Sequence, residues 1–176
     1  ALESTREAKP SEPRTVPAPP NPEGVIGPVA TGVDRTELDR IFEALNTVPA
    51  DFTIHPKLAK QFDTRRKMFE AGEVDWSLGE ALAFGSLLAE GTPVRLAGQD
   101  SRRGTFSQRH AALVDFHTGD DYLPLSALTT DGSELWIYDS LLSEYAALGF
   151  EYGYSVENPD ALVMWEAQFG DFVNGA

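Results

Sequence analysis

The sequence predicts an α/β domain whose mostly parallel sheet is flanked by helices. Residues 161–165 are a nearly unbroken apolar run with the length and composition of a buried strand, and the run at residues 92–98 predicts another strand. A helical pattern precedes each run, one beginning at Ser77 and the other at Glu144. Alternating helices and strands are typical of α/β folds, so we expect residues 76–176 to form this domain.

The N-terminal part of the chain predicts a linker and a helical connector. Residues 1–33 contain seven prolines among scattered charges, a composition typical of a semi-extended interdomain linker. In residues 34–75 we expect two helices, one that Pro49 ends and one over residues 56–69. The basic face of the second helix predicts either a solvated surface or a docking surface for a neighbouring domain. The first helix is predicted from an apolar stripe at Leu38, Ile41, Phe42 and Leu45.

Turn and cap signals divide residues 76–176 further. Ser77 and Glu80 have the spacing of a capping box, and Gly91 is placed to end the same helix. We expect further strands at residues 111–116 and 135–138, separated by a turn-rich stretch at 118–122.

Composition excludes several classes of function. The net charge is −14 with a pI of about 4.5, which argues against nucleic acid or an anionic membrane as a partner. The absence of cysteine excludes disulfides and thiolate metal sites and fits a cytoplasmic protein. His55, His110 and His117 have no metal-ligand spacing, and neither a nucleophile elbow nor a phosphate-binding P-loop is present.

Two groups of residues are candidates for chemistry. Glu144 starts a helix that is followed by a buried strand, and ligand sites of α/β sheets lie at the carboxyl ends of strands. The loop after residues 92–98 contains Arg102 and Arg103, with Arg109 and His110 just beyond. These guanidinium groups predict either a clamp for a carboxylate or ion pairs with acidic side chains of the protein.

Three sequence blocks carry a resemblance to a known family. They are GQDSRRGTFSQRHA, DSLLSEYAALGFEYGY and WEAQFGDFVNGA, which begin at Gly98, Asp139 and Trp165. They resemble the pyrimidine-binding domain of the thiamine-diphosphate-dependent first component of the 2-oxoglutarate dehydrogenase complex, most closely its actinobacterial multifunctional form. The resemblance implies an enzyme that decarboxylates 2-oxoglutarate and passes the succinyl group to lipoamide in the citric acid cycle.

The resemblance also implies roles for individual residues. Glu144 matches the glutamate that hydrogen-bonds the pyrimidine ring nitrogen, which makes it both a catalytic and a cofactor-binding residue. His110 is implied as a second catalytic residue and Arg109 as a substrate ligand. The resemblance implies further contacts to the ring. Phe172 is the implied stacking residue, with Phe169 as the competing aromatic, and Gln168 contacts the ring edge. Leu142 forms an apolar wall near Glu144.

Cofactors and partners follow from the same resemblance. Thiamine diphosphate and Mg²⁺ are implied, but the G-D-G motif that holds the diphosphate and metal in this superfamily does not occur in the sequence. We therefore expect the metal ligands outside this segment and a domain that is incomplete at its C-terminus. A homodimer and a lipoyl-bearing acyltransferase component are the implied protein partners.

Two alternatives stay open. A related thiamine enzyme would act on pyruvate, a branched-chain 2-oxo acid or a ketose, although the block SRRGTFSQRH disfavours it. A non-catalytic scaffold or regulatory module would keep the domain without activity, which Glu144 together with Phe172 argues against.

Overall fold

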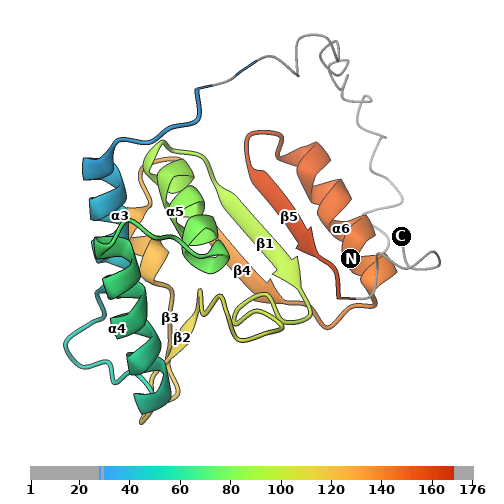
Figure 1. The fold of residues 1–176 in the computed structure, drawn as a ribbon. Helices are drawn as coiled ribbons and strands as arrows, with labels where there is room; N and C mark the ends of the chain where they lie inside the picture. Colours follow the sequence, from blue (N-terminus) through green and yellow to red (C-terminus); the bar gives the residue numbers. More distant parts are fainter. Residues whose placement is uncertain (1–27, 29, 169–176) are drawn as a thin grey trace, which may run out of the picture. The chain divides into compact units, whose positions relative to one another are not determined.

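Three parallel strands form the centre of the fold: β1 (Val94–Gly98), β4 (Leu135–Asp139) and β5 (Leu162–Glu166). Figure 1 shows them side by side in the order β4-β1-β5. The structure is a computed structural model and describes residue 28 and residues 30–168. Helices flank the sheet, which confirms the predicted fold class.

The register of the strands places three residues in one row. Val94 of β1 pairs with both Leu135 and Leu162, and Gly98 pairs with both Asp139 and Glu166. The three strands therefore end at the same level. The loops that follow them must emerge together at the carboxyl edge of the sheet.

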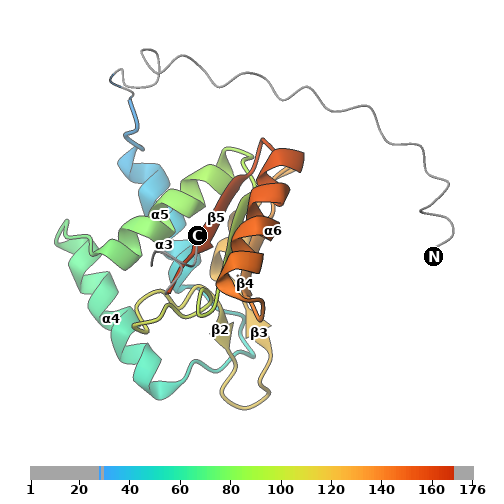
Figure 2. The ribbon, with the colours of Figure 1, turned by 90° about the vertical axis from the view of Figure 1, so that its right-hand side faces the viewer.

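Each face of the sheet is covered by helices, so β1 is buried on both sides. Val94 and Leu96 belong to the hydrophobic core beside α5 (Trp76–Ala89). Arg95 points the opposite way and pairs with Glu151 of α6 (Glu144–Glu157). Figure 2 shows the sheet between α5 and α6. This alternation is the period-two geometry of a strand.

The predicted connector helices are present, and the first of them packs against α5. They are α3 (Arg35–Asn46) and α4 (Pro56–Glu70). Phe42 of α3 stacks on Phe69 of α4 with ring centroids 4.1 Å apart. The 3-10 helix η1 (Pro124–Leu128), which the sequence did not predict, contacts both α3 and α5. The core therefore extends from the sheet into the connector.

The predicted capping box is wrong. The cap of α5 is Asp75, whose carboxylate accepts the backbone N–H of Leu78 at 2.7 Å. Ser77 instead donates to the backbone carbonyl of Gln108, and Glu80 pairs with Arg109. Tertiary partners thus take both side chains that the local pattern assigned to the helix end. Gly91, with φ +91°, ends the helix as predicted.

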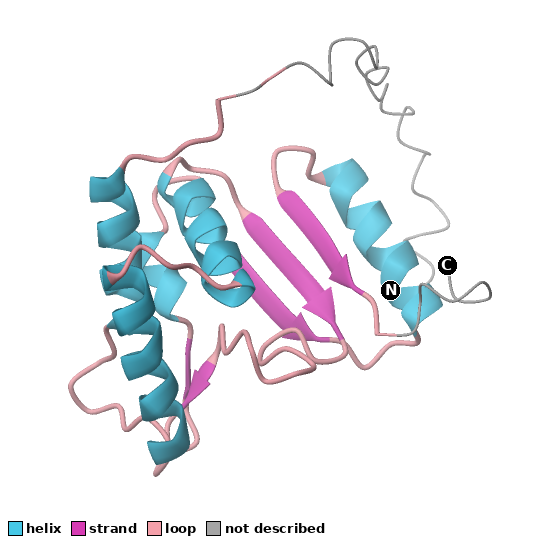
Figure 3. Cartoon of the chain, in the orientation of Figure 1, coloured by secondary structure: helices cyan, strands magenta, loops and turns pink. Residues whose placement is uncertain are grey.

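The region after the first loop also differs from expectation. Only β2 (Leu113–Val114) forms within the predicted strand 111–116, and it pairs antiparallel with β3 (Asp121–Tyr122) in a stretch predicted as a turn (Figure 3). Asp115 ends β2 because its carboxylate accepts the backbone N–H groups of Thr53, His117 and Thr118. These bonds lower the pKa of Asp115 to about 2.

Candidate functional site

The carboxyl edge of the sheet gathers the candidate residues. Ser140, just after β4, donates its backbone N–H to the carbonyl of Gly98 at 2.5 Å. The backbone N–H of Arg102 donates to the carboxylate of Asp139 at 2.9 Å. The loop after β1 is thereby attached to the end of β4. Parallel α/β sheets bind their ligands at this edge.

Glu144 lies at the first turn of α6, half-buried beside this edge. Ser143 caps the helix, since its hydroxyl accepts the backbone N–H of Ala146 at 3.4 Å. The Glu144 carboxylate accepts the backbone N–H of Gln168, just beyond β5, at 2.8 Å. The structure thus brings together two residues that the sequence analysis assigned to the same site, and the helix N-terminus favours a negative charge there.

Exposed apolar side chains neighbour Glu144 in the sequence. Leu142 is 49% exposed, and Leu141 and Tyr145 are also exposed. Large apolar side chains thus precede and follow this carboxylate in the chain, and its role toward a ring ligand stays a prediction. Phe169 and Phe172 lie outside the described residues.

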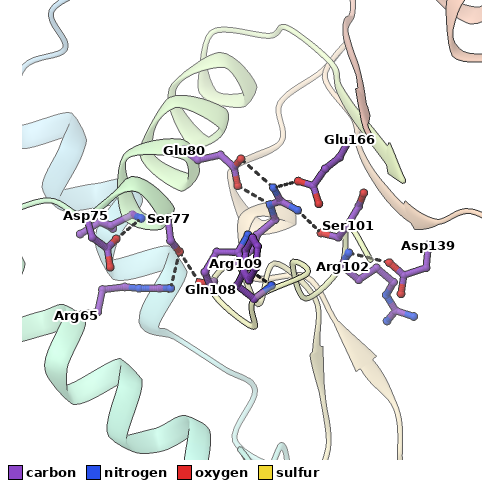
Figure 4. Close-up of polar contacts among 12 residues, drawn as sticks. Arg65, Asp75, Ser77, Glu80, Ser101, Arg102, Gln108, Arg109, Asp139 and Glu166 are labelled. Carbon is purple, nitrogen blue, oxygen red and sulfur yellow. Dashed lines mark hydrogen bonds and ion pairs between the residues drawn. The ribbon is translucent and has the colours of Figure 1, made fainter. Parts of the chain in front are cut away.

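Arg109 is buried and makes contacts in three directions (Figure 4). Its guanidinium donates to both carboxylate oxygens of Glu80 at 2.5 and 3.1 Å, to the carboxylate of Glu166, and to the carbonyl of Ser101 at 2.9 Å. Burial by itself would lower the pKa of Arg109, but the hydrogen bonds to Glu80 and Glu166 outweigh it and raise the pKa. Of the two readings of the arginine loop, the ion-pair geometry is the one present at Arg109, and its role as a substrate ligand stays a prediction.

His110 follows Arg109 with an unusual backbone conformation. Its φ is +46° and that of Ser107 is +55°, a region that costs a residue other than glycine about 1–3 kcal/mol and that is often found at functional sites. Burial lowers the pKa of the imidazole. A hydrogen bond with the backbone of Ser107 opposes that change, and the charges of Arg65 and Arg103 add to it. The ring is therefore neutral near pH 7 and can accept a proton.

A cavity of about 770 Å³ lies beside the same loop. Its lining includes the cations Lys57, Arg102 and Arg103, the carboxylates Asp115 and Asp139, the imidazole of His110 and the apolar Leu113. Glu144 is not among the residues that line it. The structure therefore separates the candidates into Glu144 on one side and His110 with the Arg102 and Arg103 loop, which lines this cavity, on the other.

Some residues of the site were missed by sequence reasoning. Glu80, Asp139 and Glu166 each bind the arginine loop directly. Asp139 and Glu166 each stand immediately after a predicted strand, which is a signal that could have found them. Glu80 gave no such signal because the capping pattern accounted for it.

Two absences concern only the part of the chain that the structure describes. Within residues 30–168 no group of three His, Cys, Asp or Glu side chains is arranged to hold a metal ion. No helix in that range is long and apolar enough to cross a bilayer.

Fold and site together define an α/β domain with a half-buried carboxylate, Glu144, at the carboxyl edge of its parallel sheet. Residues 72–176 match the family described as transketolase, pyrimidine binding domain. The chain belongs to this family.

Similar proteins include the multifunctional 2-oxoglutarate metabolism enzymes of Mycobacterium sp. (strain JLS) and Mycolicibacterium vanbaalenii. Each is 53% identical to the chain over 154 residues. The alignment covers 84% of this chain but only 12% of each relative. The chain thus spans a small part of the length of these relatives.

Proposed function

We propose that the chain is the pyrimidine-binding part of a thiamine-diphosphate-dependent enzyme that decarboxylates 2-oxoglutarate and transfers the succinyl group to lipoamide. The observation that carries the proposal is the Glu144 carboxylate, half-buried at the start of α6 and held by the backbone N–H of Gln168. The identity of 53% to enzymes named for 2-oxoglutarate metabolism supports the substrate.

Glu144 performs the acid/base step that belongs to this chain. Bound thiamine diphosphate supplies the electron sink that a 2-oxo acid needs for decarboxylation. Glu144 would share a proton with the pyrimidine ring nitrogen, while the backbone N–H of Gln168 holds its carboxylate in place. Positioned groups of this kind contribute about 10²–10⁴-fold to a rate.

The surrounding residues bind and orient. By the resemblance, Leu142 would form an apolar wall, the amide of Gln168 would meet the ring edge, and Phe172 would stack on the ring, with Phe169 as the competing aromatic. His110, neutral near pH 7, takes a proton at the substrate. Its neighbours Arg102 and Arg103 offset the repulsion that a chain of net charge −14 exerts on an acidic substrate.

The assembly proposed for the whole enzyme follows the resemblance. Mg²⁺ and the diphosphate are held by residues outside this chain, across the interface of a homodimer, and a lipoyl-bearing acyltransferase component accepts the product. The enzyme is cytoplasmic. The 176-residue chain alone is inactive in this proposal because it supplies only the pyrimidine half of the site.

The test is Glu144→Gln in the full-length polypeptide. Glutamine keeps the shape and can still accept from Gln168, but it cannot share a proton, so decarboxylation should fall by about 10²–10⁴-fold. Glu134→Gln is the matched control because Glu134 is exposed and precedes β4 at the opposite end of the strand. Decarboxylation by Glu144→Gln within threefold of the parent would overturn the proposal.

A further inference from the structure

The residue before His110 attaches its loop to two separate elements. Arg109 forms a two-pronged contact with Glu80 of α5 and a further contact with Glu166 at the end of β5 (Figure 4). A third contact, to the carbonyl of Ser101, ties the two ends of the loop together. Four of the five N–H donors of a guanidinium are thereby used within the protein.

The backbone around Arg109 is fixed as well. The carbonyl of Gln108 accepts the hydroxyl of Ser77 at 2.6 Å. The backbone N–H groups of Arg109 and His110 both donate to the carbonyl of Arg103 at 3.0 Å. The left-handed conformation of His110 thus persists because contacts on either side of it determine the path of the chain.

The segment that Arg109 contacts also binds Glu144. Glu166 lies two residues before Gln168, whose backbone N–H binds the Glu144 carboxylate. The side-chain amide of Gln168 also donates to the hydroxyl of Thr105, in the loop, at 3.1 Å. Two bridges therefore join the His110 loop to the short segment that holds Glu144, namely Arg109 with Glu166 and Thr105 with Gln168.

We propose that Arg109 and Glu166 are positioning residues that hold the His110 imidazole and the Glu144 carboxylate in one rigid frame. A charge-assisted fork suits this task because it fixes direction as well as distance. The inference rests on the proposed function for its catalytic meaning. The physical coupling itself depends only on the contacts described.

The test compares Glu166→Gln with Asp121→Asn in the full-length polypeptide. Glutamine leaves an acceptor for Arg109 but removes the charge, so the chain keeps its packing. Asp121→Asn is the matched control, because it also removes one carboxylate charge. That charge pairs with Arg102, an arginine of the same loop as Arg109, at 2.5 Å. The probe is diethyl pyrocarbonate, with modified histidines identified by peptide mass spectrometry.

His110 should react slowly in the parent because its Nε2 atom is buried. In Glu166→Gln we expect its modification to become about tenfold faster, the size expected for loss of one charged hydrogen bond. Asp121→Asn should leave the rate unchanged, and the exposed His117 serves as the internal reference. Hydrogen exchange at residues 140–150 and 165–168 should also accelerate in Glu166→Gln alone.

Turnover separates positioning from simple stability. Per active site, kcat of Glu166→Gln should fall about tenfold with an unchanged KM, as for an interaction used in the transition state, and Glu166→Asp should recover part of it. The positioning role would be refuted if His110 were modified at the same rate in the parent and in Glu166→Gln. It would also be refuted if Asp121→Asn accelerated the modification as much as Glu166→Gln does. The labelling experiment needs neither cofactor nor turnover. A fully active Glu144→Gln enzyme would therefore overturn the proposed function, whereas the labelling result for Arg109 and Glu166 would still stand.

Discussion

The carboxylate of Glu144 accepts the backbone N–H of Gln168 at 2.8 Å, although 24 positions separate the two residues in the chain. The bond joins the start of α6 to the segment after β5. The parallel pairing of β1 with both β4 and β5 makes it possible, because it brings the chain back to the same edge of the sheet after each helix. Predictions about this edge therefore depend on how the sheet and its helices are held.

The buried ion pair between Arg95 and Glu151 should be essential for the packing of α6 against the sheet. The side chains are only 11% and 6% exposed, and the Arg95 guanidinium lies 4.5 Å from the ring centroid of Tyr154. Arg95→Ala leaves a buried carboxylate without its partner, so it should cost about 3–5 kcal/mol in urea unfolding of the 176-residue chain.

A double variant tests the reason for that cost. Arg95→Met with Glu151→Leu should be more stable than either single variant, because no buried charge remains. Arg40→Ala, which breaks an exposed pair with Glu37, is the control and should shift the unfolding midpoint little. A double variant as unstable as the sum of the singles would contradict this account.

Gly98 should tolerate no side chain because β1 ends in close contact with its neighbours. A Cβ at this position would lie 2.5 Å from the carbonyl oxygen of Glu166 and 2.6 Å from the hydroxyl of Ser101. Gly98→Ala should therefore destabilise the chain by about 1–3 kcal/mol, as overpacking does. Gly149→Ala in α6 meets nothing within 4 Å and should instead be neutral or stabilising by up to about 1 kcal/mol. Equal unfolding midpoints for the two variants would refute the crowding at Gly98.

The stability of the chain should fall as the pH is lowered from 7.5 to 5, in part because of His110. Burial holds the pKa of this imidazole below its ordinary value of about 6.5. The unfolded chain therefore binds a proton first, and the stabilisation present above pH 6.5 is lost as the pH falls through the folded pKa.

His110→Gln, which carries no charge at any pH, should show a smaller loss over the same range. Asp115 titrates near pH 2 in the folded state and so does not contribute between pH 5 and 7.5. Thermal unfolding at several pH values is the measurement. Parallel curves for parent and variant would show that the His110 pKa is not depressed.

The 176-residue chain should bind thiamine diphosphate only weakly. The part of the chain that the structure describes contains no metal-binding cluster, and the net charge of −14 repels a diphosphate. Calorimetric titration with the cofactor and Mg²⁺ should show no saturation at micromolar concentrations. A micromolar Kd would mean that the diphosphate ligands lie within this chain.

The sequence by itself determined the α/β class, the helices and parallel strands, and Glu144 as the candidate carboxylate. Apolar periodicity predicted α3 from Leu38, Ile41, Phe42 and Leu45, because burial of one face leaves a direct pattern in the residues. An apolar run predicted β5 as a buried strand, and the strand is present, but its five residues are only half-buried at the edge of the sheet. The matched sequence blocks predicted the family. These patterns lie within short stretches of the chain, so they can be recognised without knowledge of the fold.

Only the tertiary structure decided which partners the polar side chains take. Ser77 and Glu80 fit a capping box locally, yet they bind Gln108 and Arg109, whose positions depend on the path of a distant loop. Arg109 could equally have met a substrate or an acid until β5 placed Glu166 beside it. A charged group finds its partner through contacts that form only when distant segments meet, and the spacing of residues along the chain does not encode which segments those are.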